Sequence, residues 1–300
     1  MGTIKTQLTD GSTADLPHGV SVSPLTPIIG AEVSGLFLGD ALSDETILQI
    51  RSALLKHKVL VFRDQDITAE QHVAFAKRFG ELEIHPIYEH HPDFDELVVL
   101  RASKDKPAAE NIYHADTTFR EKPGMGSILR CVECPEVGGD TIWCNMVEAY
   151  SRLPDHVKRV IDGTTAVHDV MPSFSKIVSD PEKRKDIRKQ LPPVEHPVVR
   201  THPESGEKIL YVNQTFTSHF AGYNAEFEGT VGRERKLDSD NMLLYLTRQA
   251  EIPEYQVRIR WAPNTVVFWD NRSTQHYAIQ DYFPASRCMH RATIIGDVPF

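Results

Sequence analysis

Two separated groups of residues have types and spacings that could bind a metal ion. The segment Tyr113–Phe119 contains His114 and Asp116 in an H-x-D pattern. Residues i and i+2 of an extended strand point to the same side, so this imidazole and this carboxylate could face one ion. An H-x-D triplet alone is a weak signal because it arises often by chance. A third candidate ligand, His276, follows an apolar run and a polar turn within Trp269–Ala278.

Two arginines follow His276, Arg287 after eleven residues and Arg291 after fifteen. Two histidines and one carboxylate on one face of a metal leave open positions opposite, which is the ligand set of non-heme iron(II) oxygenases. A guanidinium nearby could hold the far carboxylate of a dicarboxylate co-substrate through paired hydrogen bonds. Other interpretations stay open at this point. The same ligands could hold zinc for a hydrolysis, the arginines could form surface ion pairs, or the fold could be a binding module without catalysis.

The elements expected to position these residues are mostly short strands. Apolar runs separated by turn-forming pairs predict strands at residues 59–62, 97–100, 127–132, 141–143, 166–169, 197–200, 209–212, 255–261, 265–269 and 292–295. Helices are expected at residues 43–56, 68–80, 146–161, 181–190 and 238–250, and Ser43 and Thr68 are suitable N-caps for the first two. This pattern predicts a mainly β fold of the α+β class, an antiparallel barrel or jelly roll with helical insertions.

Charge and composition exclude several classes of function. The 300 residues include 33 Lys and Arg against 42 Asp and Glu, a net charge of −9. This balance argues against a nucleic-acid binder or a polybasic membrane anchor, because both need a basic face. No apolar run approaches the roughly 20 residues that span a bilayer, and the N-terminal residues lack the apolar core of a signal peptide. We expect a cytoplasmic protein with a flexible lead-in at residues 1–15 and one domain at residues 16–300.

Five motifs occur in a fixed order along the chain: Arg78–Leu82, His114–Phe119, Gly138–Thr141, His196–Pro203 and Trp269–Asp297. This pattern resembles the iron(II)- and 2-oxoglutarate-dependent dioxygenases of the taurine dioxygenase (TauD/TfdA-like) family, which also includes alkylsulfatases and 2,4-D dioxygenase. The likeness runs from about residue 25 to the end of the chain. It implies a double-stranded β-helix, which is a cupin-like jelly-roll barrel.

The resemblance implies roles for individual residues near the metal. His114, Asp116 and His276 would be the iron ligands and the catalytic centre. Arg287 would bind the far carboxylate of 2-oxoglutarate, assisted by the hydroxyl of Thr141. Arg291, from the same C-terminal motif, would face the anionic head group of the substrate or help to hold the co-substrate.

Four further residues are implied to contact the substrate. His85 and Tyr88 resemble the substrate-contacting pair of the taurine-specific members, and Phe174 corresponds to an aromatic wall. Glu110 stands where those members have asparagine. A carboxylate there could pair with an ammonium group or change the substrate, or Asn111 could take the role.

The reaction implied by the resemblance is hydroxylation of a small anionic substrate with iron(II), 2-oxoglutarate and O2, yielding succinate and CO2. Taurine or a related aminoalkyl sulfonate is the first expectation, with release of sulfite and an aldehyde. An alkyl sulfate ester, an aryloxyalkanoate or an amino acid could undergo the same chemistry. A homodimer or homotetramer is also implied. The stretch 220–235 is longer than in these relatives, which leaves substrate and assembly open.

Overall fold

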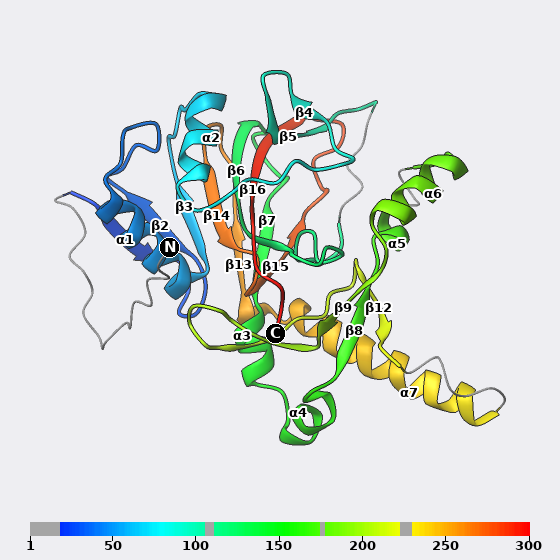
Figure 1. Ribbon diagram of the computed structural model, residues 1–300. Coiled ribbons are helices and arrows are strands. Elements are labelled where there is room, and N and C mark those ends of the chain that lie inside the picture. The colour runs from blue at the N-terminus through cyan, green and yellow to red at the C-terminus, as the bar shows by residue number, and fades with distance from the viewer. Residues whose placement is uncertain (1–18, 106–110, 175–177, 223–229) are drawn as a thin grey trace, which may run out of the picture.

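An eight-stranded sheet lies at the centre of the computed structural model, which describes residues 19–105, 111–174, 178–222 and 230–300 (Figure 1). The predicted lead-in at residues 1–15 lies outside the described residues. Strands from both ends of the chain are neighbours in this sheet, in which β2 and β3 are the parallel pair. In spatial order its strands are β1 (Ser21–Pro24), β2 (Ala31–Ser34), β3 (Val59–Phe62), β14 (Val266–Asp270), β6 (Gly124–Glu133), β16 (Arg287–Ile295), β5 (Phe94–Ala102) and β4 (His90–His91).

A three-stranded antiparallel sheet packs against one face of the large sheet. Its order is β13 (Gln256–Ile259), β7 (Thr141–Asn145), β15 (Thr274–Ala278). Alternate residues of a strand point to opposite faces, so Val59 and Val61 of β3 point toward the smaller sheet. They share one buried cluster with Trp269 of β14, Trp143 of β7 and Val257 of β13. This cluster holds the two sheets together, and its tryptophans pack against the site described below.

Two helices cover the opposite face of the large sheet. The intervening residues of the strands, among them Phe62 and Phe268, pack in a second cluster with α1 (Asp44–His57) and α2 (Ala69–Lys77). Both helices start where the sequence predicts. The Ser43 hydroxyl accepts a hydrogen bond from the Thr46 amide at 3.2 Å, and Thr68 forms a capping box with Gln71.

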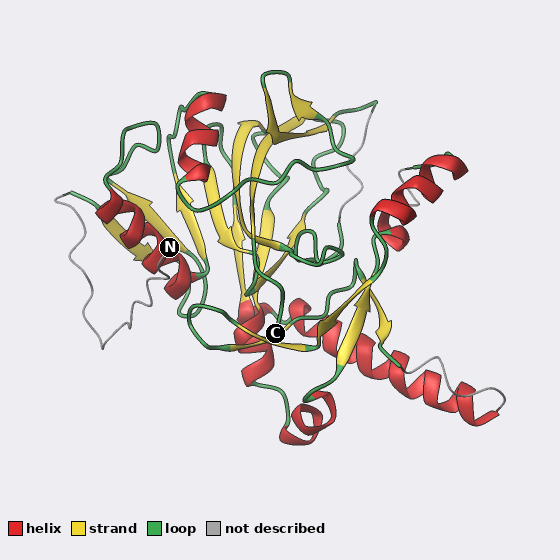
Figure 2. Ribbon diagram, viewed as in Figure 1, coloured by secondary structure: helices red, strands yellow, loops and turns green. Residues whose placement is uncertain are grey.

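Most of the other elements lie below and to the right of this strand-rich centre in the view of Figure 2. A three-stranded sheet consists of β12 (Thr217–Phe220), β8 (Thr165–His168) and β9 (Val194–Pro197), and a two-stranded sheet of β10 (Val199–Thr201) and β11 (Lys208–Leu210). The remaining helices are α3 (Met146–Ser151), α4 (Asp155–Ile161), α5 (Met171–Phe174), α6 (Pro181–Gln190), α7 (Thr230–Thr247) and two short 3₁₀ helices, η1 (Arg248–Glu251) and η2 (Pro253–Tyr255). In the described part of the chain, no helix combines the length and the apolarity needed to cross a membrane.

Most predicted elements are confirmed. The strand predicted at residues 197–200 is instead the end of β9 and the start of β10, which are separated at Val198. Strand 59–62 and helix 181–190 have the predicted bounds. The single helix predicted at residues 146–161 is two helices, because Pro154 is extended (ψ 144°), lacks an amide hydrogen and disfavours the helical conformation at Leu153. Strand β15, which carries His276, was not predicted.

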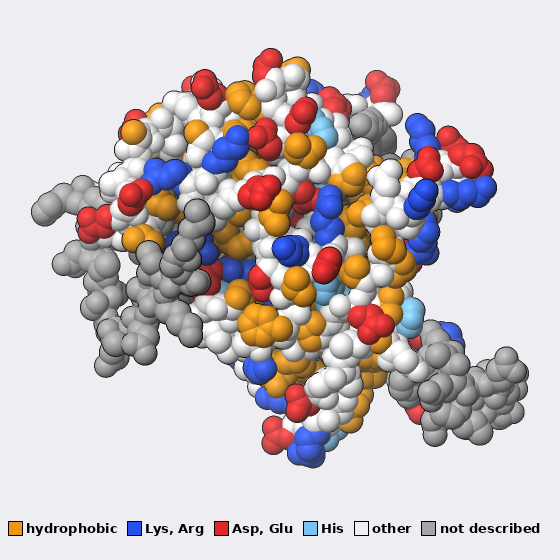
Figure 3. Space-filling model, viewed as in Figure 1, with side chains coloured by type: hydrophobic (Ala, Val, Ile, Leu, Met, Phe, Trp, Pro, Cys, Tyr) orange, Lys and Arg blue, Asp and Glu red, His pale blue; other side chains and the backbone are white. Residues whose placement is uncertain are grey.

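The surface agrees with the acidic composition. On the face drawn in Figure 3, basic and acidic side chains are interspersed over the described part of the molecule. This mixture lacks the continuous basic face that a nucleic-acid backbone requires.

Candidate active site

His114 and His276 lie opposite each other in an isolated β-bridge. The amide of each donates to the carbonyl of the other, at 3.1 Å and 2.8 Å. The two ring centroids are 4.2 Å apart. On its other side, the His276 ring contacts Trp143 and Trp269, with centroids at 6.1 Å and 5.1 Å. The buried indoles therefore fix one imidazole, and the bridge places the second beside it.

Asp116 lies in a turn, so the strand expected through His114 and Asp116 is wrong at its second half. The reason is Thr117, whose φ of 56° is left-handed and incompatible with a strand. The carboxylate nevertheless returns to the histidines. Its Oδ1 is 3.6 Å from Nε2 of His114 and 4.0 Å from Nε2 of His276. The three side chains are buried, and one ligand atom from each lies within 4.8 Å of the others.

The protonation states of these groups suit a cation. Nδ1 of His114 is 2.8 Å from the carbonyl oxygen of Ile112, which can only accept, so Nδ1 carries a proton and Nε2 is the nitrogen that faces Asp116. Burial, with a smaller contribution from the charge of His114, lowers the pKa of His276 to about 3. Burial alone would raise the pKa of Asp116, but Arg291 and the histidines outweigh it and hold that pKa well below its usual range. Two imidazoles and an ionised carboxylate therefore converge, which is the donor chemistry of a divalent metal site.

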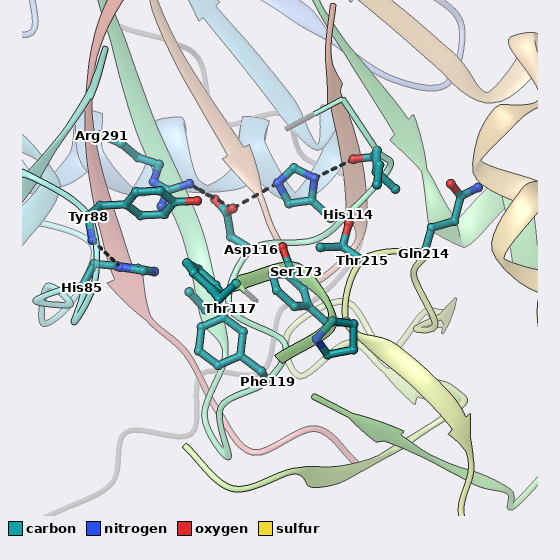
Figure 4. Close-up of a pocket in the computed structure, with 14 residues that line it drawn as sticks. His85, Tyr88, His114, Asp116, Thr117, Phe119, Ser173, Gln214, Thr215 and Arg291 are labelled. Carbon is teal, nitrogen blue, oxygen red and sulfur yellow. Dashed lines mark hydrogen bonds and ion pairs between the residues drawn. The ribbon is translucent and has the colours of Figure 1, made fainter. Parts of the chain in front are cut away.

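A cavity of about 150 Å³ opens beside this group (Figure 4). His114 and Asp116 form one wall, and apolar or aromatic side chains form most of the remainder. The lining consists of His85, Tyr88, Ile112, His114, Asp116, Thr117, Phe119, Pro172, Ser173, Phe174, Gln214, Thr215, Phe216 and Arg291. A cavity of this kind suits a small organic molecule whose reacting carbon lies next to the metal.

His85, Tyr88 and Phe174 come together as the sequence predicts. The centroid of the His85 ring is 4.5 Å from that of Tyr88 and 6.2 Å from that of Phe174. Nδ1 of His85 accepts from the amides of Ile87 and Tyr88, at 3.3 Å and 3.4 Å, so Nε2 carries the proton of the neutral ring. Burial, and next the charge of Arg291, lowers the pKa of His85 to about 3. His85 is thus a neutral hydrogen-bond donor on the cavity wall.

Arg291 lines the same cavity but also contacts a predicted metal ligand, which the sequence did not indicate. Its Nη1 is 3.0 Å from Oδ1 and 2.9 Å from Oδ2 of Asp116. The guanidinium also lies 5.8 Å from the centroid of the Tyr88 ring. Nη1 therefore holds the carboxylate of Asp116, while the side chain borders the space a substrate would occupy.

Arg287 and Thr141 lie close together, away from this cavity. Nη2 of Arg287 is 3.5 Å from the hydroxyl of Thr141, which also accepts a hydrogen bond from Nε1 of Trp261 at 3.0 Å. Arg287 and Arg291 share one face of β16 with Met289, which is buried between the two sheets. Arg291 is four residues beyond Arg287 along the strand, which separates their Cα atoms by about 13 Å. The two side chains can therefore bind two different anions.

Glu110 lies outside the described residues, as do residues 223–229 of the long stretch 220–235. Gln214, Thr215 and Phe216 line the cavity but carry no metal-ligand or charge pattern that would place them there from the sequence.

Comparison with known proteins agrees with this geometry. Residues 21–293 match the family described as "Taurine catabolism dioxygenase TauD, TfdA family". The chain belongs to this family. It is 35% identical to the "Alpha-ketoglutarate-dependent sulfate ester dioxygenase" of Pseudomonas putida, over 97% of this chain and 95% of that protein.

Solved structures of TauD/TfdA-like proteins extend the comparison. A "Putative Alpha-ketoglutarate-dependent Taurine Dioxygenase" from Burkholderia xenovorans aligns with a TM-score of 0.78 and 35% identity, over 93% of this chain and 94% of that one. The structure of AAD-2 in complex with Mn(II) and N-oxalylglycine aligns with a TM-score of 0.76 and 29% identity, over 93% and 98%. Our protein is therefore a 2-oxoglutarate-dependent dioxygenase, with iron(II) as its cofactor and 2-oxoglutarate and O2 as co-substrates. This membership favours the oxygenase over a zinc hydrolase or a binding module.

Proposed function

We propose that this dioxygenase hydroxylates a small organosulfur anion at the carbon that carries the sulfur group, with an alkyl sulfate ester as the first choice and an alkylsulfonate as the second. The observation that carries this proposal is the cavity beside the His/Asp/His group. It has a buried arginine and a neutral histidine donor for an anionic head, and apolar walls for an organic chain. We also propose that the two facing sheets are the predicted double-stranded β-helix, within one domain.

Taurine, the first expectation from the sequence, is less well matched by the described walls. Its ammonium group needs an acidic partner, and Asp116 is the one carboxylate among the described residues that line the cavity. That carboxylate already pairs with Arg291 and belongs to the metal group. The similarity to a sulfate ester dioxygenase points the same way. A sulfate ester with an apolar chain therefore fits the described residues better.

Different residues of the chain would bind the metal ion, the co-substrate and the substrate. His114, Asp116 and His276 would hold iron(II). Iron(II) held there would supply the O2 chemistry that couples decarboxylation of 2-oxoglutarate, to succinate and CO2, with insertion of one oxygen atom into a substrate C–H bond. Arg287 would pair with the far carboxylate of 2-oxoglutarate, assisted by the Thr141 hydroxyl, and this pairing sets the orientation of the co-substrate.

The substrate is positioned from the other side. Arg291 and the Nε2 proton of His85 would hold the anionic head, and the rings of Tyr88 and Phe174 exclude water from the reacting carbon. Hydroxylation of the carbon that bears a sulfate ester gives an unstable product that collapses to an aldehyde and sulfate. Hydroxylation next to a sulfonate gives an aldehyde and sulfite.

A substrate panel tests this proposal. Purified protein with iron(II), 2-oxoglutarate and air is given hexyl sulfate, hexanesulfonate, taurine or 2,4-dichlorophenoxyacetate, and succinate, sulfate and sulfite are measured. We expect the largest succinate formation with hexyl sulfate, matched mole for mole by sulfate. The proposal fails if 2,4-dichlorophenoxyacetate supports faster turnover than both sulfur compounds with a hexyl chain.

Substitution of Arg291 by alanine is expected to raise the KM for the organosulfur substrate. A hydrogen bond to a charged group contributes about 1.5–3 kcal/mol, which corresponds to an increase of roughly 10- to 100-fold. Steady-state assays at saturating iron and 2-oxoglutarate measure this change. Arg101→Ala, at an exposed arginine of the neighbouring strand β5, is the matched control and should leave the KM unchanged. An unaltered KM in Arg291→Ala would remove Arg291 from the substrate site.

Titration of His85 is expected to cause no change in the KM for the substrate near pH 6.5. Because its pKa is lowered from 6.5 to about 3, the protonated form is reached only in strong acid, and the ring stays neutral between about pH 5 and 8. Profiles of KM against pH for the wild type and for His85→Phe should therefore have the same shape, with the variant about 10-fold higher throughout. A step near 6.5 that the variant lacks would show that His85 binds as a cation.

A further inference from the structure

Asp116 lies in a turn and pairs with no strand in the described part of the chain, so another contact must fix its backbone. The side-chain amide of Asn271 does so. Its Oδ1 accepts a hydrogen bond from the amide of Asp116 at 2.7 Å, and its Nδ2 donates to the Asp116 carbonyl at 2.9 Å. One side chain thus provides both hydrogen bonds that a neighbouring strand would provide.

The amide of Asn271 can act in one orientation only. Its Nδ2 also donates to the carbonyl of Gly124 at 3.1 Å, so its acceptor and both of its donor hydrogens are used. Rotation by 180° would place the oxygen against two carbonyl oxygens. The backbone amide of Asn271 donates to Met125 at 3.0 Å, and the residue is fully buried. A buried amide without these partners would be costly, so the contact is specific.

The residues on either side of Asn271 are held by buried charges. Asp270 accepts from Nη2 of Arg272 at 2.6 Å and from Nε2 of His202 at 3.0 Å. Burial alone would raise the pKa of Asp270, but the charge of Arg272 outweighs it and holds that pKa below its usual range. The Asp270 carboxylate is therefore ionised and paired, and the loop between β14 and β15 is anchored on both sides of Asn271.

We propose that Asn271 is a positioning residue that fixes Asp116 so that its carboxylate meets His114 and His276. Asn271 does not line the cavity, so it acts on the metal group and not on the substrate. The inference rests on the proposed function in one respect, the assignment of the three side chains as iron ligands. It adds a fourth residue, whose contribution is to metal affinity.

Anaerobic titration of the metal-free protein with iron(II) tests the proposal. The fluorescence of Trp143 and Trp269, whose rings contact His276, reports binding without any turnover. Residues that orient metal ligands typically contribute 10- to 100-fold to affinity, so we expect the iron Kd of Asn271→Ala to rise by about that factor. At saturating iron, the KM for the substrate should stay near the wild-type value.

Gln65→Ala is a matched control. Gln65 is also a buried amide: its oxygen accepts a hydrogen bond from the amide of Leu38, and its nitrogen donates to the carbonyls of Leu36 and Arg63. Both variants should lower the melting temperature, but only the Asn271 variant should weaken iron binding. If Asn271→Ala does not fold, Asn271→Ser, which cannot bridge both backbone groups of Asp116, replaces it in the same comparison.

The outcomes separate this inference from the proposed function. Weaker iron binding in the Asn271 variant than in Gln65→Ala supports the positioning role. Equal iron affinity in the two variants overturns that role while the metal site stands. If the wild type itself binds no iron(II), the metal assignment fails, and with it both proposals.

Discussion

Substitution of His114 by alanine is expected to abolish iron-dependent succinate formation. The residue supplies one of only two imidazoles in the metal group, and its Nε2 faces Asp116 at 3.6 Å. Since outer residues that merely orient ligands contribute 10- to 100-fold to metal affinity, loss of a direct ligand should cost more than about 100-fold. Iron Kd from anaerobic titration and succinate yield under air both measure the effect.

A matched variant separates this effect from a general loss of stability. His156 is an exposed histidine of α4, and His156→Ala should keep wild-type activity and iron affinity. Substantial succinate formation by His114→Ala at stoichiometric iron would show that His114 is not a ligand. The His/Asp/His assignment would then be lost.

Substitution of Arg287 by alanine is expected to raise the KM for 2-oxoglutarate by at least about 30-fold while iron affinity in the absence of 2-oxoglutarate stays near wild type. Truncation of one partner of a buried, hydrogen-bonded charge pair costs about 2–5 kcal/mol. The Arg287 guanidinium lies 5.7 Å from the centroid of the Trp261 ring and 3.5 Å from the Thr141 hydroxyl, which fixes the position of its charge. Assays with variable 2-oxoglutarate at saturating iron and substrate measure the KM.

Two further variants sharpen the test of Arg287. Arg287→Lys keeps the charge but cannot form paired hydrogen bonds with a carboxylate, so its KM should fall between wild type and alanine. Thr141→Val should give a smaller increase, because one neutral hydrogen bond contributes about 1 kcal/mol. Equal KM values for 2-oxoglutarate in the wild type and Arg287→Ala would place the co-substrate elsewhere.

The sheets and helices were largely predictable because their signals are local. Continuous apolar runs mark β3 and β14, whose residues are buried on both faces, and capping residues mark the starts of α1 and α2. Strand β15 was missed because its residues, Thr274–Ala278, are mostly polar. Thr274, Gln275 and His276 are buried nonetheless, because the first two hydrogen-bond to buried backbone carbonyls and the His276 ring packs against Trp143 and Trp269.

The site was predictable in composition and not in detail. The types and spacing of His114, Asp116, His276 and Arg287 pointed to the chemistry before any fold was known. The turn at Thr117 could not be foreseen, because its left-handed backbone depends on tertiary hydrogen bonds. Contacts such as that of Arg291 with Asp116 join residues far apart in sequence, and no local pattern encodes them.

The net charge of the chain likewise does not predict the local charge of the site. A total of −9 describes the solvated surface, whereas Arg287 and Arg291 gather positive charge between the two sheets. That local exception to the acidic composition allows an acidic protein to take two anions as reactants.

The central claim is that the His/Asp/His group holds iron beside a site for an organosulfur anion. One measurement tests this claim most directly. The anaerobic protein is titrated with iron(II) and 2-oxoglutarate while its visible metal-to-ligand absorption band is recorded, and hexyl sulfate is then added. We expect a band that saturates at one iron per chain, shifts when hexyl sulfate is added, and is absent in His114→Ala. A wild-type protein with no band, or with a band that hexyl sulfate and hexanesulfonate both leave unchanged, would contradict it.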